Sequence, residues 1–191
     1  MGETPMSRMG ETPMSRTGET PVSRWIRWSK FMANEEAILK DLTGRFAFLE
    51  GKGRVARARR IFVEVPAEKW AEVFDYAVTQ AGFTILCTIT GLDLGESFGA
   101  IYHLSKVEGE VLNLQVNIPK AKPELQTIIG YFPAAELYER ELVDLLGVQI
   151  LGLPPGHRYP LPDDFPQGLY PLRKDFKAEM LDAPSPERQA K

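Results

Sequence analysis

A run of prolines near the C-terminus is the feature that most constrains what this chain can fold into. The six are Pro154, Pro155, Pro160, Pro162, Pro166 and Pro171. Proline lacks a backbone N–H and fixes φ, so the segment cannot form a continuous helix or a central strand. A backbone that is already restrained loses little entropy on binding. Residues 152–191 are therefore predicted to form an extended, proline-rich C-terminal docking arm and tail, called the arm below.

The N-terminus is an octapeptide repeated three times. The copies MGETPMSR, MGETPMSR and TGETPVSR cover residues 1–24. Each copy offers almost nothing to bury and cannot offset its ordering entropy, which predicts a disordered leader. The aromatic and apolar residues within 25–32 follow. They fit an interfacial anchor, a partner contact or packing on the domain equally well.

Residues 25–151 carry the periodicities of a folded domain. Helical spacing predicts helices over 34–44, from Pro66 to Gly82, and from Pro133 or Ala134 to Leu146. Strands are expected at 46–49, 61–65, 83–89, 98–104 and 111–116, turns at 51–53 and 91–95, and a short helical or turn segment at 125–129. Hairpins mixed with helices indicate an α+β domain, in which helices cover one face of a mainly antiparallel sheet.

Composition excludes several classes of function. A net charge of −3 gives the chain no nucleic-acid signature. Cys87 is the only cysteine and is expected in the core, and the two histidines are far apart, so neither an iron–sulfur centre nor a closed metal site is expected. No apolar run approaches the roughly 18 residues of a membrane span, and no signal peptide is evident. These features predict a reducing, cytoplasmic setting.

The helix that ends at Leu146 carries the most suggestive charges. Glu136, Arg140 and Asp144 are spaced i, i+4, i+8 as an acid–base–acid ladder. Glu139 and Glu141 border its apolar stripe, where a partner could reach them. Paired carboxylates can serve acid–base catalysis, but no nucleophile, metal-ligand set or glycine-rich loop accompanies them, so a catalytic role is disfavoured.

The roles of the charged residues of the arm also allow more than one interpretation. His157 has no other metal-ligating residues near it in the sequence, so it is interpreted as a hydrogen-bonding anchor or a surface residue. Asp163 and Asp164 are too few for a cation cage and are suited to capping a turn. Arg173 can form a bidentate pair with a carboxylate, either within the helix or on a partner.

Together these motifs resemble a known family. ERE at 139–141, DLLGV at 144–148, Gly152, LPDDF at 161–165 and YPLRKDF at 170–176 resemble the C subunit of NADH:quinone oxidoreductase (respiratory complex I). They are equally similar to the homologous small subunit of membrane-bound, energy-converting nickel-iron hydrogenases. The resemblance spans roughly residues 34–176 and excludes the octapeptide repeat. The sequence PPG at 154–156, in place of the HPDLR-like stretch of the quinone enzymes, favours the hydrogenase side.

The resemblance implies a non-catalytic structural subunit on the cytoplasmic face of the membrane. Such a subunit packs against a large catalytic subunit, with an iron–sulfur small subunit and membrane subunits as further partners. It holds no cofactor itself, and the iron–sulfur clusters, with nickel-iron in the hydrogenases, belong to partner subunits. The C subunit of complex I is the alternative, and a stand-alone adaptor or enzyme is less favoured. The expected partner interface comprises Glu139, Arg140, Glu141, Asp144, His157, Asp163, Asp164, Tyr170, Arg173, Lys174 and Asp175.

Overall fold

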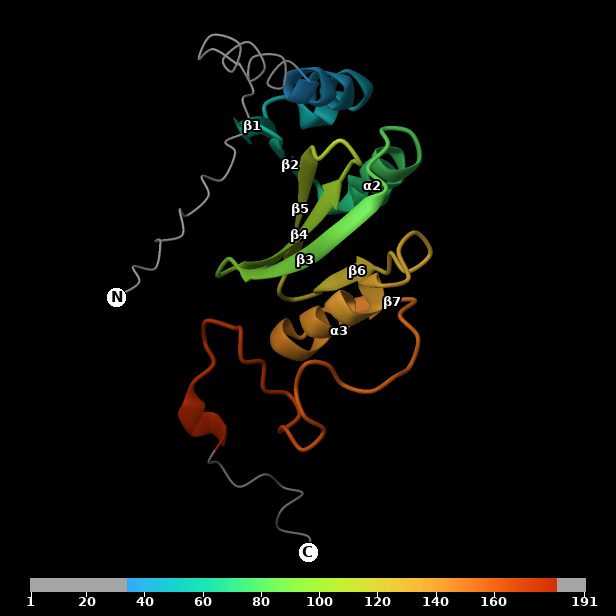
Figure 1. The fold of residues 1–191 in the computed structure, drawn as a ribbon. Helices are drawn as coiled ribbons and strands as arrows, with labels where there is room; N and C mark the ends of the chain where they lie inside the picture. The colour runs from blue at the N-terminus through green and yellow to red at the C-terminus, as the bar shows by residue number, and fades with distance from the viewer. Residues whose placement is uncertain (1–33, 182–191) are drawn as a thin grey trace, which may run out of the picture.

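The computed structural model describes residues 34–181 (Figure 1). The predictions for the octapeptide repeat, for the aromatic and apolar residues within 25–32 and for the last ten residues lie outside this range. A helix at 34–45 comes first. The elements after it are η1 (Ala47–Leu49), β1 (Gly53–Arg57), β2 (Arg60–Val65), η2 (Ala67–Lys69), α2 (Trp70–Thr79), β3 (Ile85–Asp93), β4 (Ser97–Ser105), β5 (Val111–Pro119), β6 (Glu124–Gln126), α3 (Ala135–Leu146), β7 (Gln149–Leu151) and η3 (Ala178–Leu181).

The main sheet has five strands in the order β1-β2-β5-β4-β3. Three of its four pairings are antiparallel, and the parallel pair is β2 with β5 in the centre. The α+β prediction with a mainly antiparallel sheet is therefore confirmed. Strands β6 and β7 form a separate parallel pair beside α3 (Figure 1). Alternation places Ala100 and Tyr102 of β4 in the core, whereas His103 on the same strand faces the other side.

Both α2 and α3 cover the same face of the sheet. The Trp70 ring of α2 lies 4.2 Å from the Tyr102 ring, centroid to centroid. Gly91 of β3 pairs with Ala100 and so faces the same side as Tyr102. A Cβ at Gly91 would lie 2.6 Å from methyl carbons of Leu142 and Leu146 in α3. The absence of a side chain at Gly91 therefore lets α3 pack directly on β3.

Several local predictions are wrong, most of them because distant segments pair. The predicted strand at 46–49 does not form: residues 47–49 are η1, with Phe46 and Leu49 buried at i, i+3 spacing. Strand β3 continues through the predicted turn as far as Asp93, because β4 pairs with it along that whole length. Residues 124–126 form a strand because β7 lies beside them. Cys87 is exposed rather than in the core, since the β3 register shifts between Leu86 and Thr88 around it.

The arm continues from β7 and passes along α3, where it is drawn in orange and red in Figure 1. Residues 152–177 contain neither helix nor strand, and η3 follows. None of the helices within residues 34–181 combines the length and the hydropathy that a membrane crossing requires. The arm therefore finds its contacts through side chains and isolated backbone groups rather than through a ladder of backbone hydrogen bonds.

Candidate partner-binding surface on helix α3 and the arm

Asp144 of α3 holds the first half of the arm. Its side chain is 8% exposed, and its Oδ1 accepts a hydrogen bond from Nε of Arg158 at 3.2 Å. Its Oδ2 accepts from the backbone N–H of Leu161 at 3.4 Å. Nη1 of Arg158 also donates to the carbonyl of Phe165 at 2.7 Å. One buried ion pair thus fixes the arm from residue 158 to residue 165 on the helix.

Arg140 makes a second attachment, one helical turn earlier. Its Nε and Nη2 donate to Oε1 of Glu136 at 3.1 and 2.7 Å, as expected for an i, i+4 pair. Nη2 also donates to the carbonyl of Pro154 at 2.9 Å. Gly156 lies against the guanidinium, because a Cβ there would be 2.3 Å from Nη2. The expected ladder therefore forms only in its first half, and Asp144 pairs with the arm instead.

Arg173 attaches the arm to the end of α3. Its Nε donates to the carbonyl of Leu146 at 2.7 Å, where a cation is favoured by the helix dipole. Its guanidinium carbon lies 4.1 Å from the ring centroid of Tyr170 and 5.0 Å from that of Phe98. The expected pair between Arg173 and a carboxylate of the helix is therefore wrong: the partner is a backbone carbonyl.

Gly147 makes this attachment possible. It ends α3 in the left-handed region, with φ +72°. A Cβ at this position would be 2.4 Å from Nη2 of Arg173 and 2.6 Å from the Tyr170 ring. Glycine is therefore required twice, once for the backbone conformation and once for the space that Arg173 and Tyr170 occupy.

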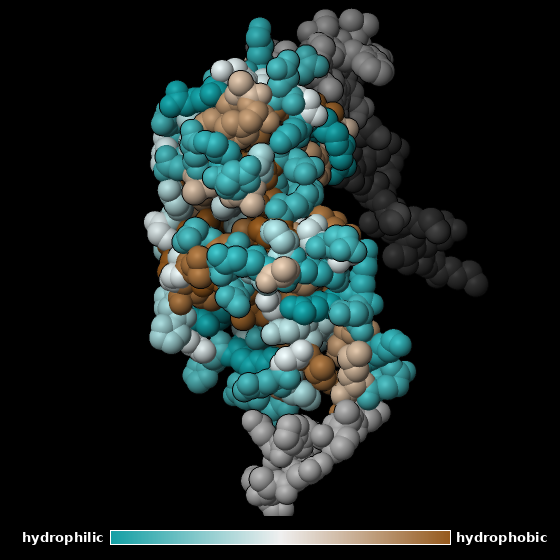
Figure 2. Space-filling view, turned by 180° about the vertical axis from the view of Figure 1, so that it is seen from behind, coloured by the Kyte–Doolittle hydropathy of each residue, from teal (hydrophilic) through white to brown (hydrophobic). Residues whose placement is uncertain are grey.

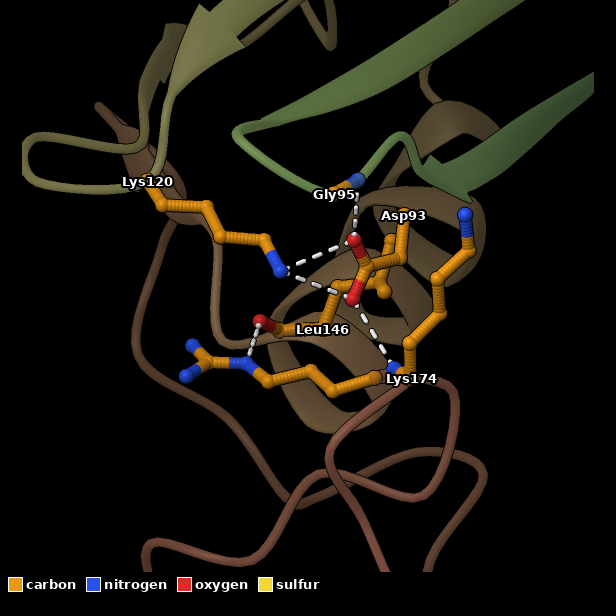
Figure 3. Close-up of polar contacts among 6 residues, drawn as sticks. Asp93, Gly95, Lys120, Leu146 and Lys174 are labelled. Atoms are coloured by element: carbon orange, nitrogen blue, oxygen red, sulfur yellow. Dashed lines mark hydrogen bonds and ion pairs between the residues drawn. The ribbon is translucent and has the colours of Figure 1, made fainter.

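Asp93 is a site residue that sequence reasoning missed. Its side chain is 2% exposed and lies 2.8 Å from Nζ of Lys120. It also accepts the backbone N–H groups of Gly95 and Lys174, each at 2.9 Å (Figure 3). Burial alone would raise the pKa of Asp93, but the hydrogen bonds from Lys120, Lys174 and Gly95 outweigh it and hold the pKa well below its usual range. The spacing of Asp93 and Gly95 indicates a turn, but nothing local points to the two lysines.

Glu139 does not lie at the surface. It is 0% exposed, and its carboxylate accepts from Thr127 Oγ1 at 2.6 Å and from the Ile128 N–H at 2.7 Å. Burial raises the pKa of Glu139, these two hydrogen bonds partly offset the effect, and the nearby Glu136 adds to it. The expectation that a partner reaches Glu139 is therefore wrong. It instead connects α3 to the segment after β6.

Asp144 is buried too and is already paired with the arm, and Arg140 is partly buried. The remaining expected interface residues are accessible to different degrees. His157, Asp163, Asp164, Lys174 and Asp175 are exposed, and Glu141, Tyr170 and Arg173 are partly buried. Large apolar side chains are exposed on the same arm, with Tyr159 at 45%, Leu172 at 52% and Met180 at 41%. Figure 2 shows one face of the molecule, on which apolar patches break a largely hydrophilic surface. Within residues 34–181, no three His, Cys, Asp or Glu side chains gather closely enough to hold a metal ion.

Sequence comparison identifies the family. The model of the family described as "Respiratory-chain NADH dehydrogenase, 30 Kd subunit" matches residues 63–180. The chain belongs to this family. The matched range includes Asp93, Lys120, all of α3 and residues 152–180 of the arm, so the attachments above lie within the family's shared region.

Relatives within the 30 Kd family belong to several complexes. The C subunit of F(420)H(2) dehydrogenase from Methanosarcina mazei is 31% identical over 73% of this chain and 90% of that protein. Membrane-bound hydrogenase subunit beta of Pyrococcus furiosus is 32% identical over 62% of this chain and 70% of that protein. In the solved structure of the membrane-bound sulfane sulfur reductase, an archaeal respiratory membrane complex, a chain 31% identical superposes with a TM-score of 0.64 over 75% of this chain and 85% of that one.

Proposed function

We propose that this chain is a non-catalytic structural subunit in the peripheral arm of a membrane-bound, energy-converting redox complex. It packs against the large catalytic subunit on the cytoplasmic face of the membrane and supports electron transfer coupled to ion translocation. It holds no cofactor of its own, and the iron–sulfur clusters, with nickel-iron in a hydrogenase, reside in partner subunits.

The observation that carries the proposal is which side chains the arm turns toward the domain and which it leaves exposed. Three arginines of the arm and α3 are turned inward, Arg158 to Asp144, Arg140 to Glu136 and Pro154, and Arg173 to Leu146, while other charged side chains of the arm stay exposed. Large apolar side chains are left outside. Apolar anchors on a backbone that is already fixed are what a stable subunit interface uses, because fixing the backbone beforehand reduces the entropy lost on binding.

Two kinds of complex fit this role. The first is a nickel-iron hydrogenase, which is supported by the PPG sequence at 154–156 and by the likeness to the Pyrococcus hydrogenase subunit. The second is an NADH:quinone oxidoreductase, supported by the family description itself. The Methanosarcina relative belongs to a dehydrogenase that uses a different electron donor, F(420)H(2).

Affinity purification of the tagged full-length chain from its own organism, followed by mass spectrometry and metal analysis, tests the proposal. The expected result is co-purification of a large catalytic subunit with stoichiometric iron. Nickel with hydrogen-dependent dye reduction identifies the hydrogenase, whereas NADH-dependent quinone reduction without nickel identifies the alternative. Recovery of the chain alone, or stoichiometric iron or nickel bound to the isolated chain, would refute the structural role.

A further inference from the structure

A small hollow lies between α3 and the first half of the arm. Its volume is about 130 Å³, well above the roughly 10–15 Å³ that one water molecule needs. Val143 and Leu153 form its apolar wall, and its polar lining includes Arg140, Asp144, His157 and Arg158. The hollow is therefore large enough to take the end of a side chain from another molecule.

The polar lining has hydrogen-bond donors left over. Both oxygens of Asp144 already accept hydrogen bonds, from Arg158 and Leu161. Among the described residues, no hydrogen bond reaches Nη1 of Arg140 or Nη2 of Arg158, and none involves His157. The charge of Arg158 is paired with Asp144 and that of Arg140 with Glu136, but each guanidinium keeps one nitrogen without an acceptor, and the exposed imidazole of His157 lies beside them. This arrangement favours an anionic group with the planar geometry of a carboxylate.

We propose that this hollow receives an aspartate or glutamate side chain of the large catalytic subunit. The inference rests on the proposed function, because it names the chemistry by which that partner is recognised. Tyr159 follows Arg158 in the chain and is 45% exposed. A free inorganic anion would leave this apolar surface uncovered, whereas a protein surface that presents a carboxylate would cover it.

Position 157 allows a direct test, because His157 is exposed and has no hydrogen-bond partner among residues 34–181. The complex would be purified through a tagged chain carrying His157→Lys and treated with a zero-length carbodiimide, which joins an amine to a carboxylate in contact with it. The matched control is Gln167→Lys, a position of the arm that is also exposed but does not line the hollow. We expect a cross-link from position 157 to one Asp or Glu of the large subunit, mapped by mass spectrometry, and none to that residue from position 167.

A second measurement reverses the sign of the charge. His157→Glu and Gln167→Glu chains would each compete with a differently tagged wild-type chain for incorporation into the complex. A like charge about 5 Å from the incoming carboxylate should reduce incorporation of the position-157 variant roughly ten-fold relative to the control. Circular dichroism of both free variants would verify that they remain folded.

The possible results separate the inference from the proposed function. If a complex forms but position 157 gives no cross-link and both Glu variants incorporate equally, the inference is overturned and the proposed function stands. A cross-link only to a carboxylate of the same chain also overturns it. If the wild-type chain recovers no large subunit, the proposed function fails and the inference fails with it.

Discussion

Replacing Asp93 with asparagine tests how the end of the arm is held. The change keeps the shape of the side chain but removes its charge and one of its two acceptor oxygens. In the native chain the carboxylate accepts from Lys120, Gly95 and Lys174 at 2.8–2.9 Å. A hydrogen bond to a charged group contributes about 1.5–3 kcal/mol when protected. Lys120 is 30% exposed and Gly95 and Lys174 are exposed, so water recovers part of this. We expect Asp93→Asn to lower the free energy of unfolding at pH 7 by about 2 kcal/mol.

The same variant predicts a pH dependence with a definite sign. The pKa of Asp93 is lowered in the folded state. Its stabilising contribution is therefore fully present above the unfolded pKa of about 3.9 and is lost as pH falls toward the folded pKa. The asparagine cannot titrate, so the gap between the wild-type and variant chains should shrink by about 1 kcal/mol between pH 5 and pH 3.

Urea unfolding of both chains at pH 7, 5 and 3 measures these differences, and Asp163→Asn is the control. Asp163 is an exposed aspartate of the arm with no hydrogen bond or ion pair to any described residue. Hydrogen exchange adds a local readout, because the Lys174 amide should exchange faster in the Asp93 variant. A gap below about 0.5 kcal/mol at pH 7, or one that stays constant down to pH 3, would refute the reasoning, since surface substitutions alone stay within that range.

Substitutions at three further positions probe the attachments of α3. Glu139→Ala should destabilise the fold by about 1–3 kcal/mol, because the Ile128 N–H stays buried without an acceptor, whereas Glu139→Gln should cost less. Since burial raises the pKa of Glu139, the advantage of wild type over the glutamine variant should grow as pH falls through that pKa; a difference that stays constant in urea unfolding at pH 4–8 would show that the pKa of Glu139 is not raised. Gly147→Ala should lower the thermal midpoint, with a loss of at least about 1 kcal/mol from the strained φ alone, and an unchanged midpoint would contradict the observed packing. Arg173→Ala should release the arm from Leu146 and increase its cleavage by trypsin while the circular dichroism of the domain is retained, and unchanged cleavage would show that the arm is held elsewhere.

The sequence predicts helix α3 almost to the residue, and the physical reasons are local. Apolar residues recur at helical spacing from Ala135 to Leu146, and Gly147 supplies the left-handed residue that ends the helix. Strands β4 and β5 follow from alternation for the same reason. The prolines likewise predict the absence of a helix or strand over residues 152–177.

The site itself could be predicted only in part, because its contacts depend on packing between distant segments. Nothing in the residues around Asp93 indicates that Lys174 will donate a backbone hydrogen bond to it from 81 positions away. Glu139 looks like a surface carboxylate until the pairing of β6 with β7 brings Ile128 over the helix. Helical periodicity identifies the side of α3 on which a residue lies, but it cannot show what covers that side.

The long sequence separation between Asp93 and Lys174 also orders events during synthesis. The ribosome adds about 5–20 residues per second. Strand β3 is therefore synthesised several seconds before Lys174, whose backbone N–H bonds to Asp93 at the end of this strand. Both strands of the central β2 and β5 pair precede the arm, so they are already made and available to pair within that interval. The surface that includes the seated arm is therefore completed after the strands of the sheet have been made. A nascent chain halted before residue 174 would display a formed sheet without it, and partner recruitment would then begin only after translation has passed that point.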